Sequence, residues 1–273
     1  MTQPSQPWQP SQQHYRRPPW VLLLPAVIGT GYLFLPLIGL LIRAPWSTLG
    51  ARLTEPGALT ALRLSLITAT ITTALCLLFG VPLAFVLART RFPGQRVVRA
   101  LVTLPLVLPP VVGGVALFTA FGRAGFIGTL LDRWFGVELP FTTAAVVMSQ
   151  TFVALPFLVI AVEGALRGAD GRFEEAAATL GASRWTAFRR ITLPLVGPGV
   201  AAGAVLCWAR ALGEFGATIT FAGNFPGTTQ TMPLKVYLTL QTDPDGAILL
   251  SLILVAVCII VLVSLRGRWI GGG

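Results

Sequence analysis

Long runs of apolar residues without charges constrain this chain more than any other feature of its sequence. A helix needs roughly 20 such residues to cross a hydrocarbon core about 30 Å thick. Water cannot satisfy backbone N–H and C=O groups in that core, so each run has to be a helix that hydrogen-bonds its own backbone. The sequence therefore predicts an all-α, polytopic membrane protein with six transmembrane helices, at about residues 20–42, 59–88, 98–121, 141–166, 194–221 and 247–265.

Charged residues are few and lie mostly at the ends of these runs. Hydrophobic residues make up 54% of the 273 residues and charged residues 11%, whereas soluble proteins carry about 25% charged residues. The net charge of +10 could indicate a nucleic-acid partner, but basic residues near span ends report membrane orientation instead. The two tails and the loops 89–99 and 167–193 hold 13 of the 20 basic residues, and the opposite loops hold 5. This bias predicts a multi-pass protein of the cell membrane, surrounded by lipid, with both termini in the cytoplasm and no nucleic-acid partner.

Two regions are expected along the chain. Residues 1–18 are rich in Gln, Pro and Ser and are predicted to be a disordered cytoplasmic tail. Residues 19–273 are predicted to form a single transmembrane domain. Its first apolar run is too long for the core of a signal peptide, so we expect an uncleaved helix there.

Helix-breaking residues interrupt the third run, namely Pro105, Pro109, Pro110, Gly113 and Gly114. Such residues are tolerated at membrane depth where neighbouring helices or a water-filled cavity satisfy the freed backbone groups. The run is therefore expected to be either a broken helix that lines a pathway or a helix with irregular packing.

Residues 167–193 form the longest polar interruption with helical character. Asp170 can cap a helix whose first turns contain Glu174 and Glu175, where the helix dipole favours negative charge. Gly181 can adopt the left-handed conformation that ends this helix, and Ser183 can cap the next one. The pattern predicts a short helical hairpin that returns the chain to the membrane.

This segment resembles a known family. Glu175-Ala176-Ala177, Gly181, Ile191 and Leu193-Pro194 stand at the spacing of the EAA loop of binding-protein-dependent ABC importer permeases. The resemblance implies type I ABC importer permease architecture and a cytoplasmic loop, here called the EAA loop (residues 167–193), that docks on an ATP-hydrolysing subunit. The alternative is an amphipathic linker that only joins two spans. On the family reading the coupling residues are Glu174, Glu175, Ala176, Ala177, Gly181, Ser183 and Arg184.

The fifth run contains the candidate translocation residues. Arg210, Glu214 and Thr218 are spaced at i, i+4 and i+8, which places them on one face of a continuous helix. A charge at membrane depth costs free energy unless it is paired or hydrated. A charged residue in a membrane span is therefore a candidate functional residue. The two alternatives are a pair that lines the translocation pathway and a salt bridge that fixes helix packing.

The residues around Arg210 and Glu214 indicate which branch of this family the chain resembles. The stretches 209–218 and 221–224 look like the oxyanion branch of these permeases, which serves molybdate, tungstate and sulfate. Residues 226–234, with Tyr237, are most similar to molybdate permeases. The resemblance implies an importer of molybdate, or alternatively of tungstate or of sulfate and thiosulfate. It also implies a homodimer, two ABC ATPase subunits and an extracytoplasmic oxyanion-binding protein as partners.

Enzymatic activity is not expected of this chain. A phosphate-binding P-loop needs a lysine after a glycine-rich turn, and the only lysine is Lys235, between Leu234 and Val236. We therefore expect ATP and Mg²⁺ to be used by the partner ATPase, with no cofactor or metal bound here. The rival from another class is a proton-coupled secondary transporter that would use Glu214 or Glu163 as a proton relay.

Overall fold

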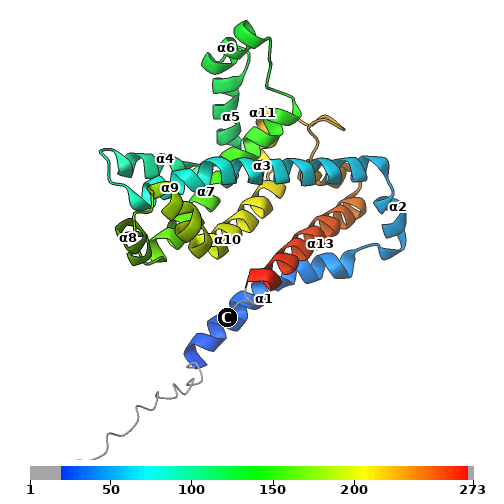
Figure 1. The fold of residues 1–273 in the computed structure, drawn as a ribbon. Helices are drawn as coiled ribbons and strands as arrows, with labels where there is room; N and C mark the ends of the chain where they lie inside the picture. Colours follow the sequence, from blue (N-terminus) through cyan, green and yellow to red (C-terminus); the bar gives the residue numbers. More distant parts are fainter. Residues whose placement is uncertain (1–19, 270–273) are drawn as a thin grey trace, which may run out of the picture. The chain divides into compact units, whose positions relative to one another are not determined.

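A computed structural model describes residues 20–269, and every regular element in that range is a helix (Figure 1). The predicted all-α class is therefore confirmed. The predicted tail, residues 1–18, lies outside the described residues. The chain divides into two units, residues 1–44 and 45–273. The helices are α1 (Trp20–Arg43), η1 (Trp46–Thr48), α2 (Leu49–Leu53), α3 (Pro56–Arg89), α4 (Gln95–Val107), α5 (Pro110–Phe121), α6 (Phe126–Phe135), α7 (Thr143–Gly168), α8 (Arg172–Thr179), α9 (Arg184–Ala187), η2 (Phe188–Thr192), α10 (Leu193–Leu212), α11 (Gly216–Phe221), α12 (Met232–Thr242) and α13 (Pro244–Trp269).

Five of these helical segments are long and apolar enough to cross a membrane, judged over residues 20–269. They are Trp20–Arg43, Pro56–Arg89, Thr143–Gly168, Arg184–Leu212 and Pro244–Ser264. The pair α4 and α5 brings the number to six if it is counted as one bent span. These positions agree with the predicted runs except for the fifth run.

The first unit contains α1, which matches the predicted first span within one residue. None of its residues is buried, and its mean hydropathy is 2.2. A helix that is apolar on all sides is typical of a membrane span.

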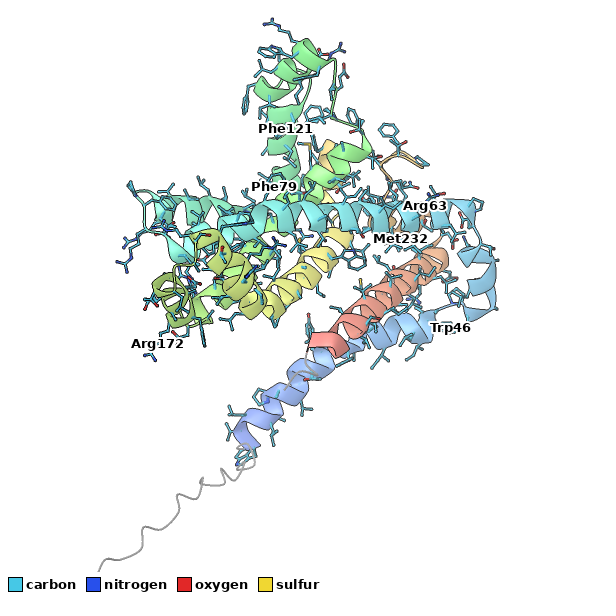
Figure 2. All side chains as sticks on the ribbon, in the orientation of Figure 1. Trp46, Arg63, Phe79, Phe121, Arg172 and Met232 are labelled. Carbon is cyan, nitrogen blue, oxygen red and sulfur yellow. The ribbon has the colours of Figure 1, made fainter. Side chains whose placement is uncertain are left out.

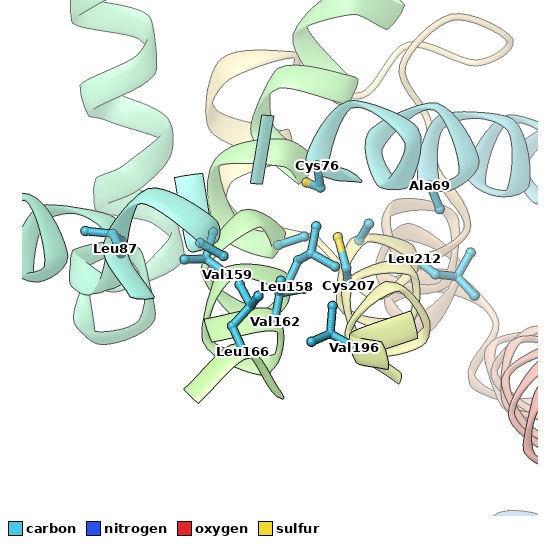
Figure 3. Packing of buried hydrophobic residues seen from close by; sticks show 13 residues of the cluster. Ala69, Cys76, Leu87, Leu158, Val159, Val162, Leu166, Val196, Cys207 and Leu212 are labelled. Carbon is cyan, nitrogen blue, oxygen red and sulfur yellow. The ribbon is translucent and has the colours of Figure 1, made fainter. Parts of the chain in front are cut away.

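The core of the second unit is formed by α3, α7 and α10. Figure 3 shows Cys76 of α3, Leu158 and Val162 of α7 and Cys207 of α10 meeting in one buried cluster. Small residues allow α10 to approach α7 closely, because a Cβ added at Gly203 would lie 2.9 Å from the Cβ of Ala161. Without a hydrophobic driving force between helices in lipid, such close packing is a main source of association.

The third predicted span is broken, as one of the two alternatives anticipated. Helix α4 ends at Val107, α5 begins at Pro110, and the two axes are bent by 119° (Figure 1). Pro109 restricts the residue before it to extended conformations, so Leu108 cannot continue the helix; its ψ is 133°. Helix α5 then packs against α11.

The fifth span differs from its prediction. The prediction of one continuous helix over about 194–221 is wrong, because α10 ends at Leu212 and α11 begins only at Gly216. The carboxylate of Glu214 accepts a hydrogen bond from the backbone N–H of Ala217 at 2.9 Å. That bond satisfies one of the free N–H groups at the start of α11, so Glu214 stabilises a new helix start in place of a continuous helix.

Ionic contacts join the elements at the start of α3 and α13. Arg52 pairs with Asp243, and Lys235 Nζ lies 3.5 Å from Glu55 Oε1. The backbone N–H of Gly246 and the Arg52 guanidinium hold the pKa of Asp243 below its ordinary value. The carboxylate that caps α13 therefore stays charged at neutral pH.

Candidate functional site: the EAA loop and the Arg210–Glu214 pair

The EAA loop is a helical hairpin, as predicted. Helix α8 ends at Thr179 and is followed by Gly181, whose φ is +81°. The hydrogen bonds from Gly181 N to Ala178 O and from Ala182 N to Ala177 O are both 3.0 Å. This pattern is a Schellman motif, which needs a residue with positive φ and therefore favours glycine. The N–H of Thr186 donates to Ser183 Oγ at 3.2 Å, so Ser183 caps α9.

Asp170 lies one residue before the N-cap position, which the sequence predicted it to occupy. The cap residue of α8 is Gly171, and Asp170 Oδ1 accepts a hydrogen bond from the N–H of Arg172 at 3.0 Å. Glu174 and Glu175 lie in the first turn of α8, as predicted. The carboxylates therefore still complement the positive end of the helix dipole.

Glu174 attaches the EAA loop to the membrane bundle. Its Oε1 lies 3.2 Å from Arg89 Nη2, at the end of α3, and accepts a hydrogen bond from Thr192 Oγ1 at 2.9 Å. The same Arg89 nitrogen donates to Ala169 O at 3.4 Å. Sequence reasoning missed Arg89, because nothing in the local pattern links it to a carboxylate 85 residues later.

The outer surface of the EAA loop combines apolar and charged side chains. Leu180 is 89% exposed, Trp185 68% and Phe173 57%. Arg172, labelled in Figure 2, is the first residue of α8 and is also exposed. Exposed apolar groups clustered with charges are typical of protein docking sites. Of the predicted coupling residues, Glu175, Ala176, Gly181, Ser183 and Arg184 are exposed here, whereas Ala177 is buried and Glu174 is half-buried.

One helical run connects the EAA loop to the candidate translocation residues. Helix α9, the π-helix η2 and α10 follow one another without a break over Arg184–Leu212. Trp185 on the loop and Arg210 therefore belong to the same helical run.

Arg210 and Glu214 form the predicted pair. Arg210 Nη2 lies 2.7 Å from Glu214 Oε2, and the side chains are 27% and 1% exposed. The contact is an ion pair between a partly exposed guanidinium and a buried carboxylate. Glu214 thus compensates a charge and caps α11 with its two oxygens.

Thr218 does not lie on a helix shared with Arg210. It is fully buried in α11, and its hydroxyl has no hydrogen-bond partner among the described residues. Nearby, Ser149 Oγ donates to Ala217 O at 3.3 Å, which joins α7 to α11. The structure therefore brings Arg210 and Glu214 together but places Thr218 in the packed core.

This chain is similar in sequence to known transport permeases. The chain is 53% identical to the molybdenum transport system permease protein ModB of Mycobacterium bovis over 251 residues, 92% of this chain and 94% of the relative. It is 33% identical to the sulfate transport system permease protein CysT of Escherichia coli K12 over 249 residues, 88% of this chain and 90% of the relative.

A solved structure shares the fold at low sequence identity. It is the crystal structure of a bacterial ABC transporter involved in the import of the acidic polysaccharide alginate, with a TM-score of 0.69 and 20% identity. The match covers 91% of this chain and 93% of that chain. The predicted permease architecture is confirmed.

The sequence pattern of one family, described as binding-protein-dependent transport system inner membrane component, matches residues 80–271. That range includes α7, α10, the EAA loop and the Arg210–Glu214 pair. The chain therefore belongs to the family of binding-protein-dependent transport system inner membrane components.

Proposed function

We propose that this chain is the membrane-spanning permease subunit of an ATP-driven importer that carries molybdate into the cytoplasm. The observation that carries the proposal is the 53% identity to a molybdenum transport permease over nearly the whole of both chains. The sulfate permease is more distant, at 33% identity. The substrate is therefore a tetrahedral oxyanion, and molybdate is favoured over sulfate.

Energy for transport comes from a separate subunit on this proposal. Two ATPase subunits bind ATP and Mg²⁺ and contact the EAA loops of two copies of this chain. The geometry supports this role, because Leu180 and Trp185 project from a loop that Glu174 anchors to α3. An extracytoplasmic binding protein delivers the anion, and the distribution of basic residues supports an orientation with the loop and both termini in the cytoplasm.

The pathway role of Arg210 and Glu214 follows from their charge. A dianion that crosses a low-dielectric bundle needs positive charge or dipoles, but a full uncompensated positive charge would hold it too tightly. Glu214 partly neutralises Arg210 at 2.7 Å. Since Arg210 lies in the last turn of α10, movement of the EAA loop changes the position of this group along one helix.

Transport by the reconstituted complex tests the proposal. We expect ATP-dependent uptake of molybdate into proteoliposomes that contain this chain, its ATPase and its binding protein, with sulfate as a weaker substrate. Uptake driven by a proton gradient without ATP would instead support a secondary transporter. A stronger uptake of sulfate would reject molybdate as the main substrate.

Two tryptophans of similar exposure test the docking surface. Trp185 on the EAA loop is 68% exposed and Trp134 on α6 is 73% exposed. We expect Trp185→Ala to reduce co-purification of the ATPase and Trp134→Ala to leave it unchanged. Equal co-purification in both variants would contradict docking at the EAA loop.

A further inference from the structure

We propose that Arg99, Glu163 and Arg167 form a binding site for a tetrahedral oxyanion, at the end of the bundle that carries the EAA loop. The site lies between the first turns of α4 and the last turns of α7. It is separate from the Arg210–Glu214 pair, which lies at the other end of α10 from the loop.

Both guanidiniums converge on one carboxylate oxygen. Arg99 donates to Glu163 Oε1 from Nε at 3.1 Å and from Nη2 at 2.8 Å, and Arg167 does the same at the same distances. Arg99 Nη2 also donates to Leu87 O at 3.1 Å. Glu163 is buried, with 11% of its side chain exposed, whereas the side chains of Arg99 and Arg167 are 34% and 56% exposed.

The cluster has an excess of positive charge and of donors. Two guanidiniums face one carboxylate, so the group carries one net positive charge. Each guanidinium has five N–H groups, and the five bonds above leave five of the ten without a partner among the described residues. Planar guanidinium forks match the oxygens of phosphate-like anions better than other side chains do.

Space for a ligand lies beside these donors. Arg99, Ile160, Glu163, Gly164 and Arg167 line a shallow cavity of about 320 Å³ that is largely open to the surface. A Cβ added at Gly164 would meet no atom within 4 Å, so the wall is open at that point. A four-oxygen anion that enters the cavity would take donors from both arginines, and Glu163 would compete with it and keep its binding reversible.

Two sources can supply this chemistry. The first is the phosphate of an anionic phospholipid, whose chains would contact Ile160, which is 46% exposed. The second is a free oxyanion such as the transported molybdate, and this source alone rests on the proposed function. In the proposed orientation the site faces the cytoplasmic surface, where anionic lipids favour basic residues.

Binding to the purified full-length chain in detergent tests the site. The probes are sodium molybdate and inorganic phosphate by calorimetry, and phosphatidylglycerol against phosphatidylcholine by native mass spectrometry. We expect Arg167→Gln to weaken binding of the bound probe about tenfold, as befits loss of a bidentate guanidinium. Arg172→Gln is the matched control, because Arg172 is 88% exposed near the same end but lies outside the cavity.

The substitution Glu163→Gln is expected to change anion binding in the opposite direction from Arg167→Gln. Removing the competing carboxylate should strengthen anion binding several-fold, whereas a purely structural network would show only lost stability. Binding of molybdate or phosphate assigns the free-anion source, and selective binding of phosphatidylglycerol alone assigns the lipid source.

The inference is overturned if no probe binds, or if Arg167→Gln and Arg172→Gln weaken binding equally. These results are independent of the transport assay. Intact ATP-driven uptake by a chain that binds no probe would reject only this inference, and phosphatidylglycerol binding without uptake would reject only the proposed function.

Discussion

Glu214 is a buried carboxylate whose two oxygens serve different partners. One oxygen accepts the N–H of Ala217 and the other lies against Arg210. A charge at membrane depth costs several kcal/mol unless it is compensated. Loss of the Ala217 contact and loss of the Arg210 contact therefore affect the protein differently. The cap depends on an acceptor oxygen, whereas the pairing depends on charge.

Substitutions at the Arg210–Glu214 pair separate a pathway role from a packing role. Arg210→Ala leaves a buried carboxylate unpaired, and we expect a loss of roughly 3 kcal/mol in stability and severe loss of uptake. Glu214→Gln retains the acceptor for Ala217 and should be milder. The double variant Arg210→Gln/Glu214→Gln should recover thermal stability without recovering uptake. Full molybdate uptake by the double variant would exclude the pair from the pathway.

Glu174 and Glu175 are adjacent carboxylates with different surroundings. Glu174 contacts Arg89 and Thr192, whereas Glu175 is exposed. We expect Glu174→Gln to lower the free energy of local opening of the EAA loop by about 1 kcal/mol, because a charged hydrogen-bonding partner of Arg89 is lost. Hydrogen exchange over residues 172–192 measures this effect. Glu175→Gln removes the same charge one residue away and should leave exchange unchanged; similar exchange in both variants would contradict the anchoring role.

At the scale of elements, the EAA loop is a hairpin whose turn is defined by backbone conformation. Gly181 has a φ of +81°, and a Cβ there would meet no atom within 4 Å. A substitution at this position is therefore opposed by backbone strain rather than by a clash. The conformation of this turn therefore determines the positions of the exposed side chains of Leu180 and Trp185.

Gly181→Val should disrupt the hairpin and uncouple the ATPase. A β-branched residue held at positive φ costs of order 1–3 kcal/mol, which is enough to reorganise a short loop. We expect ATPase co-purification and molybdate uptake to fall together while the thermal stability of the bundle is retained. Gly136→Val is the matched control, since Gly136 also has a positive φ of +63° and open space around it but ends α6. Its ATPase co-purification should match the unsubstituted protein, and a loss equal to that of Gly181→Val would contradict the coupling role.

At the scale of the second unit, two regions contact α3 near its opposite ends. Arg89 at the C-terminal end contacts the EAA loop through Glu174. Near the other end, Ser65 Oγ accepts the N–H of Met232, which begins α12 after the 222–231 loop. Arg89 lies 24 residues after Ser65, which is about 36 Å along the helix and exceeds a hydrocarbon core of about 30 Å. We therefore expect the two regions to lie on opposite sides of the membrane.

Cysteine labelling in intact cells tests this orientation. Arg96, Arg184 and Thr228 are exposed, and in the proposed orientation only Thr228 faces outward. We expect a membrane-impermeant maleimide to label Thr228→Cys in intact cells, and Arg96→Cys and Arg184→Cys only after permeabilisation. The unsubstituted chain, in which Cys76 and Cys207 are buried, is the background control. Labelling at position 184 from outside would reject the orientation and with it the contact between the EAA loop and a cytoplasmic ATPase.

The sequence by itself determined the features that depend on hydropathy or on neighbours within one helical turn or two. Uncharged runs predicted the spans, because only helices satisfy their backbone in lipid. Gly181 and Ser183 predicted the ends of α8 and α9, since capping bonds join residues three to five positions apart. The ion pair of Arg210 with Glu214 was predictable for the same reason, although its role in the pathway stays a prediction.

Only the tertiary structure decided which distant groups meet. Glu163 binds Arg99 across 64 residues and Glu174 binds Arg89 across 85 residues, distances at which no local pattern identifies a partner. The close approach of α11 to α5 was also decided by packing, because a Cβ at Gly216 would lie 2.8 Å from the Cβ of Pro110. Close approach and long-range charge pairing depend on the three-dimensional placement of α3, α4, α5 and α7, which hydropathy and local capping do not specify.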